Sequence, residues 1–368
     1  MTTTFRYDYV GSFLRPAQLK KARQQFSDSQ ITVEQLKIVE DKSITELVEK
    51  QKEIGLKAIT DGEFRRSWWH LDFFWGLNGV ERTFIDHGYA FNGVESRPET
   101  ARLVRKISGE NHPFIEHFKF LLPLATNGVV ARQTIPAPAQ FLAEIQRPEN
   151  IEATKTVYPS DEELHSDIAK AYKTVIEELY AAGCRHLQLD DCTWGMFCDE
   201  KYWNAVGATE DEKQQIMNTF VVLNNEAIQG LPEDLTITTH VCRGNYRSTW
   251  ASSGGYEQVA PTLFSKENVE SFLLEFDTDR SGGFEPLQHV SEGKKVVLGI
   301  LSSKLGELED KEEVKKRIKE ASKFVDLENL CLSPQCGFAS TEEGNNVTEE
   351  QQWAKLRLVK EIAEEVWE

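Results

Sequence analysis

The sequence predicts an α/β protein built as a closed (β/α)8 barrel, and three observations favour this class. Eight short apolar runs, rich in β-branched residues, recur along the chain of 368 residues. Most of these runs are followed by a segment with helical periodicity, which is typical of strand–helix–strand units in a parallel sheet. The length also suits one barrel of this kind, so we expect a single domain over residues 1–368.

The apolar runs and the periodic segments place the elements in order along the chain. The expected strands are residues 7–12, 56–61, 128–135, 185–191, 235–242, 272–277, 295–301 and 329–333. The expected helices include residues 33–54, 161–182, 212–228, 311–325 and 349–367. The helix at 161–182 has clear end signals, because Ser160 is a candidate N-cap with Glu163 three residues later, and Gly183 follows its last residue.

Two stretches interrupt the repeat of strands and helices. They cover residues 68–109 and 193–209, and each directly follows an expected strand. In a barrel, segments in this position lie on the face formed by the carboxyl ends of the strands. We therefore expect them to act as lids or as contacts between subunits.

The composition excludes several functional classes. The chain has 42 Lys and Arg against 60 Asp and Glu, so its net charge is −18. Binding to nucleic-acid phosphates or to anionic membranes depends on clustered basic residues, and we expect neither as a partner. The first ten residues carry no charged and apolar leader, and no apolar window is long enough to span a membrane. These features favour a cytoplasmic protein whose six cysteines are thiols or metal ligands.

The sharpest local signal for chemistry is the pair His240 and Cys242 at the end of the fifth expected strand. Side chains alternate along a strand, so residues two apart point to the same side and converge on one point. A single metal ion suits this pair of donors. The pair alone is a weak indication, because a buried histidine is more often a hydrogen-bonded core residue than a ligand.

Two further residues strengthen the metal hypothesis. Cys336 lies between Pro334 and Gly337 after the eighth expected strand, on a loop at the mouth of the barrel rather than in the core. Glu275 is a carboxylate in an otherwise apolar sixth strand, and a buried charge of this kind requires a partner such as a cation. One histidine, two cysteines and one glutamate together supply donors that suit tetrahedral Zn²⁺.

These residues resemble the pattern of the cobalamin-independent methionine synthase family, specifically the zinc-bearing C-terminal barrel of its members. The matching segments run in the family's order through nearly the whole chain: Val10-Gly11-Ser12-Phe13-Leu14-Arg15, Asp61-Gly62-Glu63, Gln188-Leu189-Asp190-Asp191, His240-Val241-Cys242, Glu275 and Pro334-Gln335-Cys336-Gly337. The resemblance implies a TIM barrel with zinc as cofactor. It implies as the zinc ligands His240, Cys242, Glu275 and Cys336.

The resemblance also implies a substrate and the residues that bind it. It implies a methyltransferase of methionine biosynthesis, in which the thiol of homocysteine coordinates zinc, loses its proton and attacks a methyl group. Glu63 and Asp190 would hold the ammonium group, and Ser12 with neighbouring backbone amides would hold the carboxylate. The residues themselves leave simpler roles open. Glu63 could pair with Arg65 or Arg66, either Asp190 or Asp191 could cap the next segment, and Ser12 could shape a turn.

The sequence departs from the family pattern at the site of the methyl donor. The full-length synthase, a 5-methyltetrahydropteroyltriglutamate–homocysteine S-methyltransferase, has a second, N-terminal barrel that helps to bind its folate donor, and this chain is expected to be one barrel. Leu301 replaces the histidine that is thought to donate a proton to the leaving folate, so no residue is assigned as general acid. We therefore expect an altered donor: a short-tailed methyltetrahydrofolate, S-methylmethionine or a methylated corrinoid protein.

Two other functions are consistent with the same residues. An enzyme similar to epoxyalkane:coenzyme M transferase would alkylate a different zinc-bound thiol, and a non-catalytic barrel would bind zinc or thiols without reaction. Aromatic residues that follow the second expected strand could cover the site, although such a cluster more often belongs to the core or to the contact of a homodimer. This cluster comprises Trp68, Trp69, Phe73, Phe74 and Trp75.

Overall fold

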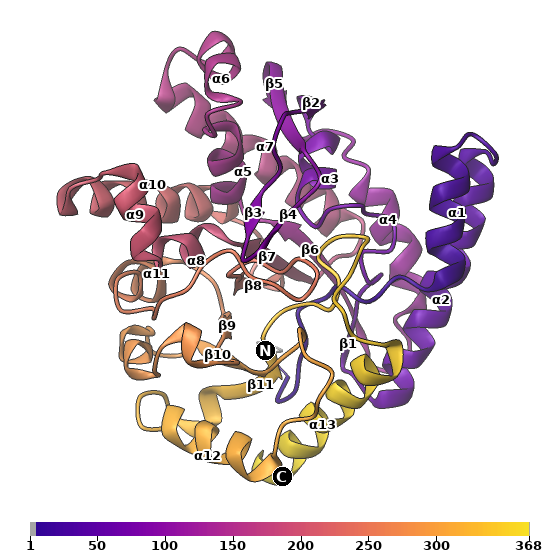
Figure 1. Cartoon of the computed structure of the whole chain (residues 1–368), viewed down its shortest axis with the longest axis vertical. Coiled ribbons are helices and arrows are strands. Elements are labelled where there is room, and N and C mark those ends of the chain that lie inside the picture. The colour runs from indigo at the N-terminus through magenta and orange to yellow at the C-terminus, as the bar shows by residue number, and fades with distance from the viewer. Residues whose placement is uncertain (1–4, 368) are drawn as a thin grey trace.

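A curled parallel sheet with helices on its outer side forms the centre of the computed structural model, which describes residues 5–367 (Figure 1). The sheet has seven strands in the order β1-β6-β7-β8-β9-β10-β11. All neighbouring strands in it are parallel. These strands are β1 Ala58–Ile59, β6 Val130–Pro136, β7 His186–Asp191, β8 Thr236–Val241, β9 Ser271–Glu275, β10 Lys295–Leu301 and β11 Leu330–Pro334.

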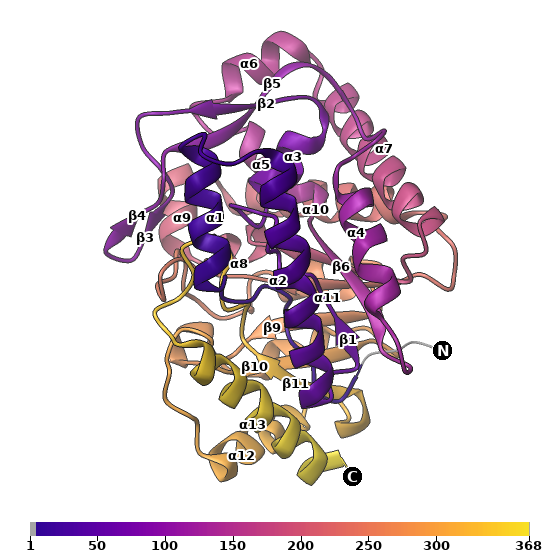
Figure 2. The same ribbon diagram turned by 90° about the vertical axis from the view of Figure 1, so that its right-hand side faces the viewer.

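Helices connect the strands and cover the outside of the sheet. The α-helices are α1 Ala17–Ser27, α2 Val33–Ile54, α3 Leu71–Gly76, α4 Phe114–Leu121, α5 Pro138–Ile145, α6 Ile151–Val157, α7 Asp161–Ala181, α8 Thr193–Phe197, α9 Glu200–Val206, α10 Glu210–Ile228, α11 Ala260–Lys266, α12 Lys311–Ala321 and α13 Glu349–Trp367. Short 3₁₀ turns are η1 Leu122–Leu124, η2 Asp279–Ser281, η3 Glu285–His289 and η4 Leu327–Asn329. Helices α1 and α2 pack against each other on one flank of the molecule (Figure 2).

The predicted α/β class is confirmed, whereas a closed ring of eight strand ladders is not formed within the described residues. The first expected strand is an extended segment that joins β11 through hydrogen bonds from Asp8 N to Leu332 O and from Leu332 N to Arg6 O, each 2.9 Å long. Toward β1, the described part of this segment has no strand ladder. Isolated hydrogen bonds occur there instead, such as the one from Thr60 Oγ1 to Gly11 O at 2.6 Å. The sheet is therefore curled but not closed by continuous pairing.

The long helices form where periodicity predicts them, and local end signals fix their limits. Helix α2 begins at a capping box, in which Thr32 and Gln35 exchange hydrogen bonds, and it ends at Gly55 with a left-handed φ of 94°. Helix α10 begins two residues earlier than expected, because Thr209 and Glu212 form a second capping box. Helix α12 stops at Ala321, four residues before the predicted end.

The two predicted excursions lie outside the central sheet. Residues 68–109 form α3 and two antiparallel pairs, β2 Asn78–Phe84 with β5 Glu99–Ser108 and β3 Ala90–Phe91 with β4 Val94–Glu95. Residues 193–209 contain α8 and α9. In the first excursion Trp68, Phe73 and Phe74 are buried in the main hydrophobic core. These three aromatic side chains therefore pack inside the molecule.

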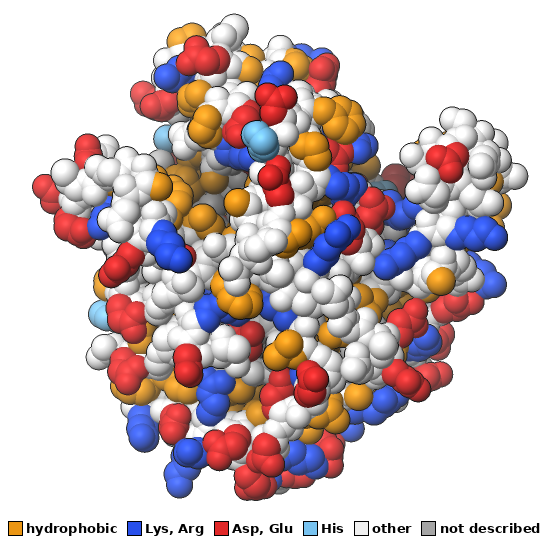
Figure 3. Space-filling model, in the orientation of Figure 1, with side chains coloured by type: hydrophobic (Ala, Val, Ile, Leu, Met, Phe, Trp, Pro, Cys, Tyr) orange, Lys and Arg blue, Asp and Glu red, His pale blue; other side chains and the backbone are white. Residues whose placement is uncertain are grey.

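The outer surface carries charged side chains of both signs (Figure 3). Figure 3 shows acidic and basic side chains interspersed on the face toward the viewer. None of the helices formed by residues 5–367 combines the length and the apolarity that crossing a membrane requires. Residues 1–4, which belong to the segment where a leader was sought, lie outside the described residues.

Candidate metal centre and substrate pocket

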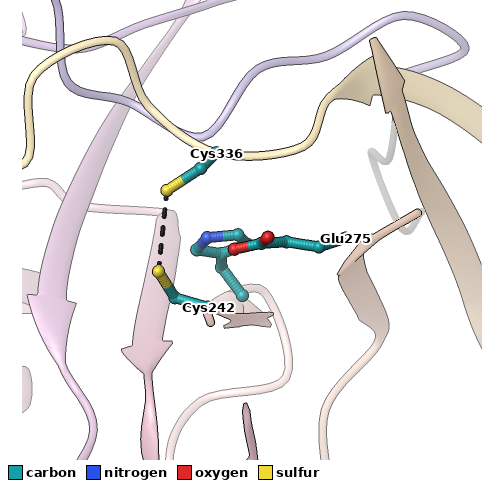
Figure 4. Close-up of side chains that lie close together, drawn as sticks. Cys242, Glu275 and Cys336 are labelled. Carbon is teal, nitrogen blue, oxygen red and sulfur yellow. Dashed lines mark hydrogen bonds between the residues drawn. The ribbon is translucent and has the colours of Figure 1, made fainter. Parts of the chain in front are cut away.

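The four predicted metal ligands lie together at the carboxyl ends of β8, β9 and β11. His240 is near the end of β8 and Cys242 follows that strand, while Glu275 ends β9 and Cys336 lies in the loop after β11. All four are buried, and one donor atom of each lies within 4.8 Å of the others. Figure 4 shows the Cys242 and Cys336 sulfurs facing each other, with the Glu275 carboxylate beside them. This cluster has the composition and the size of a site that could hold a metal ion.

The His240 ring is held in the orientation that a metal ligand requires. Its Nδ1 lies 3.2 Å from Leu273 O. A carbonyl oxygen only accepts hydrogen bonds, so Nδ1 must carry the proton and Nε2 must present a lone pair. Nε2 is buried and has no hydrogen-bond partner among the described residues. The carbonyl of β9 therefore fixes both the tautomer and the direction of the free nitrogen.

The two cysteine sulfurs form a close pair. Cys242 Sγ and Cys336 Sγ are 3.7 Å apart, and Gly244 N donates to Cys242 Sγ at 3.3 Å. The hydrogen bond with Cys242 and burial together raise the pKa of Cys336 well above that of a free thiol. The neighbouring thiol of Cys192, which precedes α8, is the largest cause of the raised pKa of Cys242. Without a cation, the cluster therefore disfavours two adjacent thiolates.

Both oxygens of Glu275 are occupied by hydrogen bonds from neighbouring loops. Arg243 N donates to Oε1 at 2.8 Å, and the Arg280 guanidinium donates to Oε2 at 3.0 Å. Burial raises the pKa of Glu275, whereas the positive charges of Lys304 and Arg280 lower it, and the net shift is downward. Glu275 is therefore an ionised carboxylate surrounded by cationic groups, even though it is fully buried.

Two of the predicted substrate-binding residues are buried carboxylates near the metal cluster. In the ladder between β7 and β8, Asp190 pairs with the ligand His240, which places them on adjacent strands at the same level. Burial and the negative charge of Glu63 raise the pKa of Asp190 well above its usual value. Burial likewise raises the pKa of Glu63. Two buried acids that oppose each other's ionisation form a suitable receptor for an ammonium group.

Ser12 connects this pocket with the loop that carries Cys336. Phe338 N donates to Ser12 O at 3.0 Å, and Ala339 N donates to Ser12 Oγ at 3.4 Å. A Cβ on Gly337 would lie only 1.9 Å from Ser12 Oγ, so this approach requires glycine. The three predicted substrate residues and the four predicted ligands thus occupy the same end of the sheet.

The structure supports two of the simpler roles considered above, an ion pair of Glu63 and a helix cap after β7. Glu63 Oε1 lies 3.3 Å from Arg66 Nη1, but Glu63 Oε2 is buried without a partner in the described part of the chain. Asp191, rather than Asp190, stabilises the start of α8 by accepting from Thr193 N at 2.9 Å. The free oxygen of Glu63 and the separate capping role of Asp191 leave Glu63 and Asp190 available to a ligand.

Sequence reasoning did not identify several residues that shape the site. Arg280 contacts Glu275 from the loop after β9, and Cys192 contacts Cys242 from the loop after β7. Lys304 is buried after β10, and the only sequence signal for it is a lysine just past an apolar strand. Leu301, predicted to replace a proton donor, is buried and belongs to the main hydrophobic cluster. A leucine side chain carries no transferable proton.

Comparisons with known proteins show the family and the fold of this chain. The model of the family described as "Cobalamin-independent synthase, Catalytic domain" matches residues 151–365. Two uncharacterized proteins of Bacillus subtilis, YxjH and YxjG, are 48% and 47% identical, and each alignment covers 99% of this chain and 95% of the relative. A 5-methyltetrahydropteroyltriglutamate–homocysteine methyltransferase of Bacillus cereus is 22% identical over 91% of this chain, which corresponds to 40% of that enzyme.

Solved structures with the same fold include two related proteins. A candidate vitamin-B12-independent methionine synthase from Listeria monocytogenes is 37% identical, with a TM-score of 0.78 over 100% of this chain and 99% of that protein. A B12-independent methionine synthase from Shewanella, solved with selenomethionine, is 22% identical with a TM-score of 0.71 over 98% of this chain and 97% of that protein. At 22% identity, the similarity to the Shewanella structure shows only that the two proteins share a fold.

Proposed function

This chain belongs to the cobalamin-independent methionine synthase family, and from that premise we propose that it is a zinc-dependent methyltransferase that converts homocysteine to methionine. One observation carries the proposal: four donor atoms lie within 4.8 Å of one another, and the buried carboxylate of Asp190 lies beside them at the same strand ends. The cluster suits thiol activation, and the carboxylates of Asp190 and Glu63 suit the ammonium end of an amino acid.

Zinc suits the donor set of His240, Cys242, Glu275 and Cys336. In a tetrahedral site with Zn–S bonds of about 2.3 Å, two sulfurs are separated by about 3.8 Å, and the observed distance is 3.7 Å. The unpartnered Nε2 of His240 supplies the nitrogen, and a dication would allow both thiols to ionise. When bound, zinc would lower the pKa of the substrate thiol and so make a thiolate available at neutral pH.

The protein's own residues would bind and orient homocysteine. Asp190 and Glu63 would accept hydrogen bonds from the substrate ammonium, which would also relieve the repulsion between the two buried carboxylates. The Ser12 hydroxyl and nearby backbone amides would donate to the substrate carboxylate. Because Asp190 pairs with His240 in the sheet, an amino acid held there would direct its thiol toward the metal ligands.

We propose a methyl donor whose leaving group needs no proton from residue 301. Leu301 is fully buried in hydrocarbon surroundings and cannot act as an acid. S-methylmethionine, which leaves as a neutral sulfide, and a methylated corrinoid protein both meet this condition. A short-tailed methyltetrahydrofolate would require a proton from another group and should react about 10²–10⁴-fold more slowly, the usual contribution of a positioned acid.

The proposal is tested by assaying the zinc-loaded protein with homocysteine and each of the three donors. We expect methionine from S-methylmethionine or the corrinoid donor, and loss of this product in Asp190→Asn. Coenzyme M in place of homocysteine tests the alternative of an alkyltransferase that acts on another thiol. X-ray absorption at the zinc edge, with and without homocysteine, tests the alternative of a structural site, because such a site would not gain a third sulfur ligand.

We further propose a cytoplasmic enzyme whose curled sheet and extended N-terminal segment together form a TIM-barrel-like (β/α)8 domain. A homodimer is the oligomeric state we propose to test. Sedimentation equilibrium of the purified protein measures the oligomeric state directly.

A further inference from the structure

A buried lysine without a hydrogen-bond partner lies beside the candidate metal centre. Lys304 is three residues past β10 and is 5% exposed. Its Nζ has no hydrogen-bond acceptor among the residues that the structure describes. An ammonium group loses strong hydration when it is buried, so it normally forms an ion pair or several hydrogen bonds. This unsatisfied cation is therefore a candidate for a function that the metal ligands alone do not explain.

The sheet places Lys304 between two strands that carry metal ligands. Strand β10 lies between β9 and β11, and Gly299 of β10 pairs with the ligand Glu275 of β9. On the other side, Ser303 N donates to Gln335 Oε1 at 2.5 Å and Ser303 Oγ donates to Gly337 O at 2.9 Å. These bonds tie the segment before Lys304 to the loop of Cys336.

The charge of Lys304 acts mainly on the acidic residues at the end of β9. Among the charged groups that lower the pKa of Glu275, Lys304 has the largest effect. This agrees with the place of Lys304 just past β10, the strand that pairs with β9 at Glu275. Lys304 also lowers the pKa of Asp277, whose net shift is upward because of burial and the charge of Glu275. Neither acid forms an ion pair with Lys304 within 4.0 Å in the described structure, because Arg280 contacts both of them.

We propose that Lys304 is a positioning residue that receives the Glu275 carboxylate when the substrate sulfur takes the place of Glu275 among the metal ligands. This role rests on the proposed function. A carboxylate that leaves a cation inside a protein needs another positive charge, because an unpaired buried charge is costly. Arg280 already bonds to Glu275, whereas Lys304 follows the neighbouring strand β10 and its Nζ has no hydrogen-bond partner among the described residues.

The exchange is a substitution without oxidation or reduction. With a metal bound, the Glu275 oxygen would leave one ligand position, the substrate sulfur would take that position, and the thiol proton would pass to solvent. Glu275 would remain an anion and would pair with the Lys304 ammonium. The charge of the metal's ligand set would be unchanged, because one anionic ligand replaces another, and Lys304 would balance the carboxylate that has left it.

Cobalt(II) in place of zinc makes this step visible, because each cobalt–thiolate bond adds charge-transfer absorption. We titrate the cobalt-loaded protein with homocysteine and compare wild type with Lys304→Met, Lys304→Arg and Lys294→Met. Lys294 precedes β10 at the opposite end of the strand and is the matched control for loss of a lysine. We expect the dissociation constant for homocysteine to rise about 30-fold or more in Lys304→Met, as for loss of one partner of a buried charge pair.

Lys304→Arg should recover most of the affinity, and Lys294→Met should resemble wild type. Binding of cobalt itself should not weaken in Lys304→Met, since Glu275 remains on the metal in the free enzyme. Unchanged homocysteine affinity in Lys304→Met overturns the role, even if turnover falls, because Lys304 would then act in methyl transfer. Loss of cobalt from Lys304→Met overturns it as well. If wild type gains no thiolate absorption at all, the proposed function itself fails and this role fails with it.

Discussion

Replacing Leu301 by histidine tests whether this position faces the methyl donor or the hydrophobic core. The sequence pattern alone would predict that a histidine here supplies the missing proton donor. In the structure, the register between β10 and β11 shifts between Gly299 and Leu301. Leu301 is 0% exposed and belongs to the main hydrophobic cluster rather than to the smaller cluster that contains Val297 of the same strand. We therefore expect Leu301→His to destabilise the protein without adding folate-dependent activity.

The size of the effect follows from two losses. Removing the buried leucine side chain forfeits about 1.5–3 kcal/mol of hydrophobic stabilisation. A buried imidazole that finds no hydrogen-bond partner costs about 1–3 kcal/mol more. The sum of roughly 2.5–6 kcal/mol is a large fraction of the stability of an ordinary protein, which is about 5–15 kcal/mol.

Denaturant unfolding measures the loss of stability, and an assay with methyltetrahydrofolate measures the gain of activity. Leu301→Met is the matched control, because it preserves volume and apolarity and should cost less than about 1.5 kcal/mol. If Leu301→His unfolds at the same denaturant concentration as wild type and turns over methyltetrahydrofolate faster, the side chain reaches the donor and the reasoning from burial is wrong.

Three further predictions concern the metal, the pH dependence of stability and the loop after β11. The purified protein should hold close to one zinc per chain. Cys336→Ser or His240→Ala should release this zinc while the circular dichroism spectrum changes little. Retention of zinc by both variants would refute the assigned ligands. Burial raises the pKa of Glu267 to about 7, so the native state binds this proton more tightly than the unfolded state. The bound proton of Glu267 stabilises the native state fully at a pH below the pKa that Glu267 has in the unfolded chain. This stabilisation, about 3 kcal/mol in all, is lost as the pH rises from that value through about 7. Unfolding measured from pH 5 to 8 should show this decline in wild type but not in Glu267→Gln, and equal slopes would contradict the assignment. Gly337→Ala should weaken homocysteine binding by displacing Ser12, while the zinc content stays near that of wild type; unaltered KM would show that the loop adapts.

Elements with long periodic patterns were predictable from the sequence, whereas short elements were not. The expected helix at 33–54 is α2 Val33–Ile54, and the expected strand at 295–301 is β10 Lys295–Leu301. Helices α4, α5, α6 and α11 have seven or eight residues and were missed. A helix of about two turns shows too few repeats for its period to stand out. The predicted closure is incomplete because the described part of the N-terminal extended segment forms no strand ladder with β1.

The candidate metal ligands were predictable because their signal is local. Alternation along β8 brings His240 and Cys242 to one side, and a carboxylate in an apolar strand indicates a buried cation partner. The contact of Arg280 with this cluster and the place of Lys304 beside β9 and β11 depend on where loops after neighbouring strands run. No pattern within either loop encodes that position, so these contacts require the folded structure.

Unsatisfied polar atoms at the carboxyl ends of the strands indicate what the fold leaves for its ligands. Within the described residues, the buried atoms without a hydrogen-bond partner include His240 Nε2, Glu63 Oε2, Gln335 Nε2 and Lys304 Nζ. Each such atom costs free energy in an empty protein. Their chemistry is complementary to a cation, an ammonium group and an anionic group. Part of this destabilisation therefore falls where a metal and an amino acid thiol would offset it.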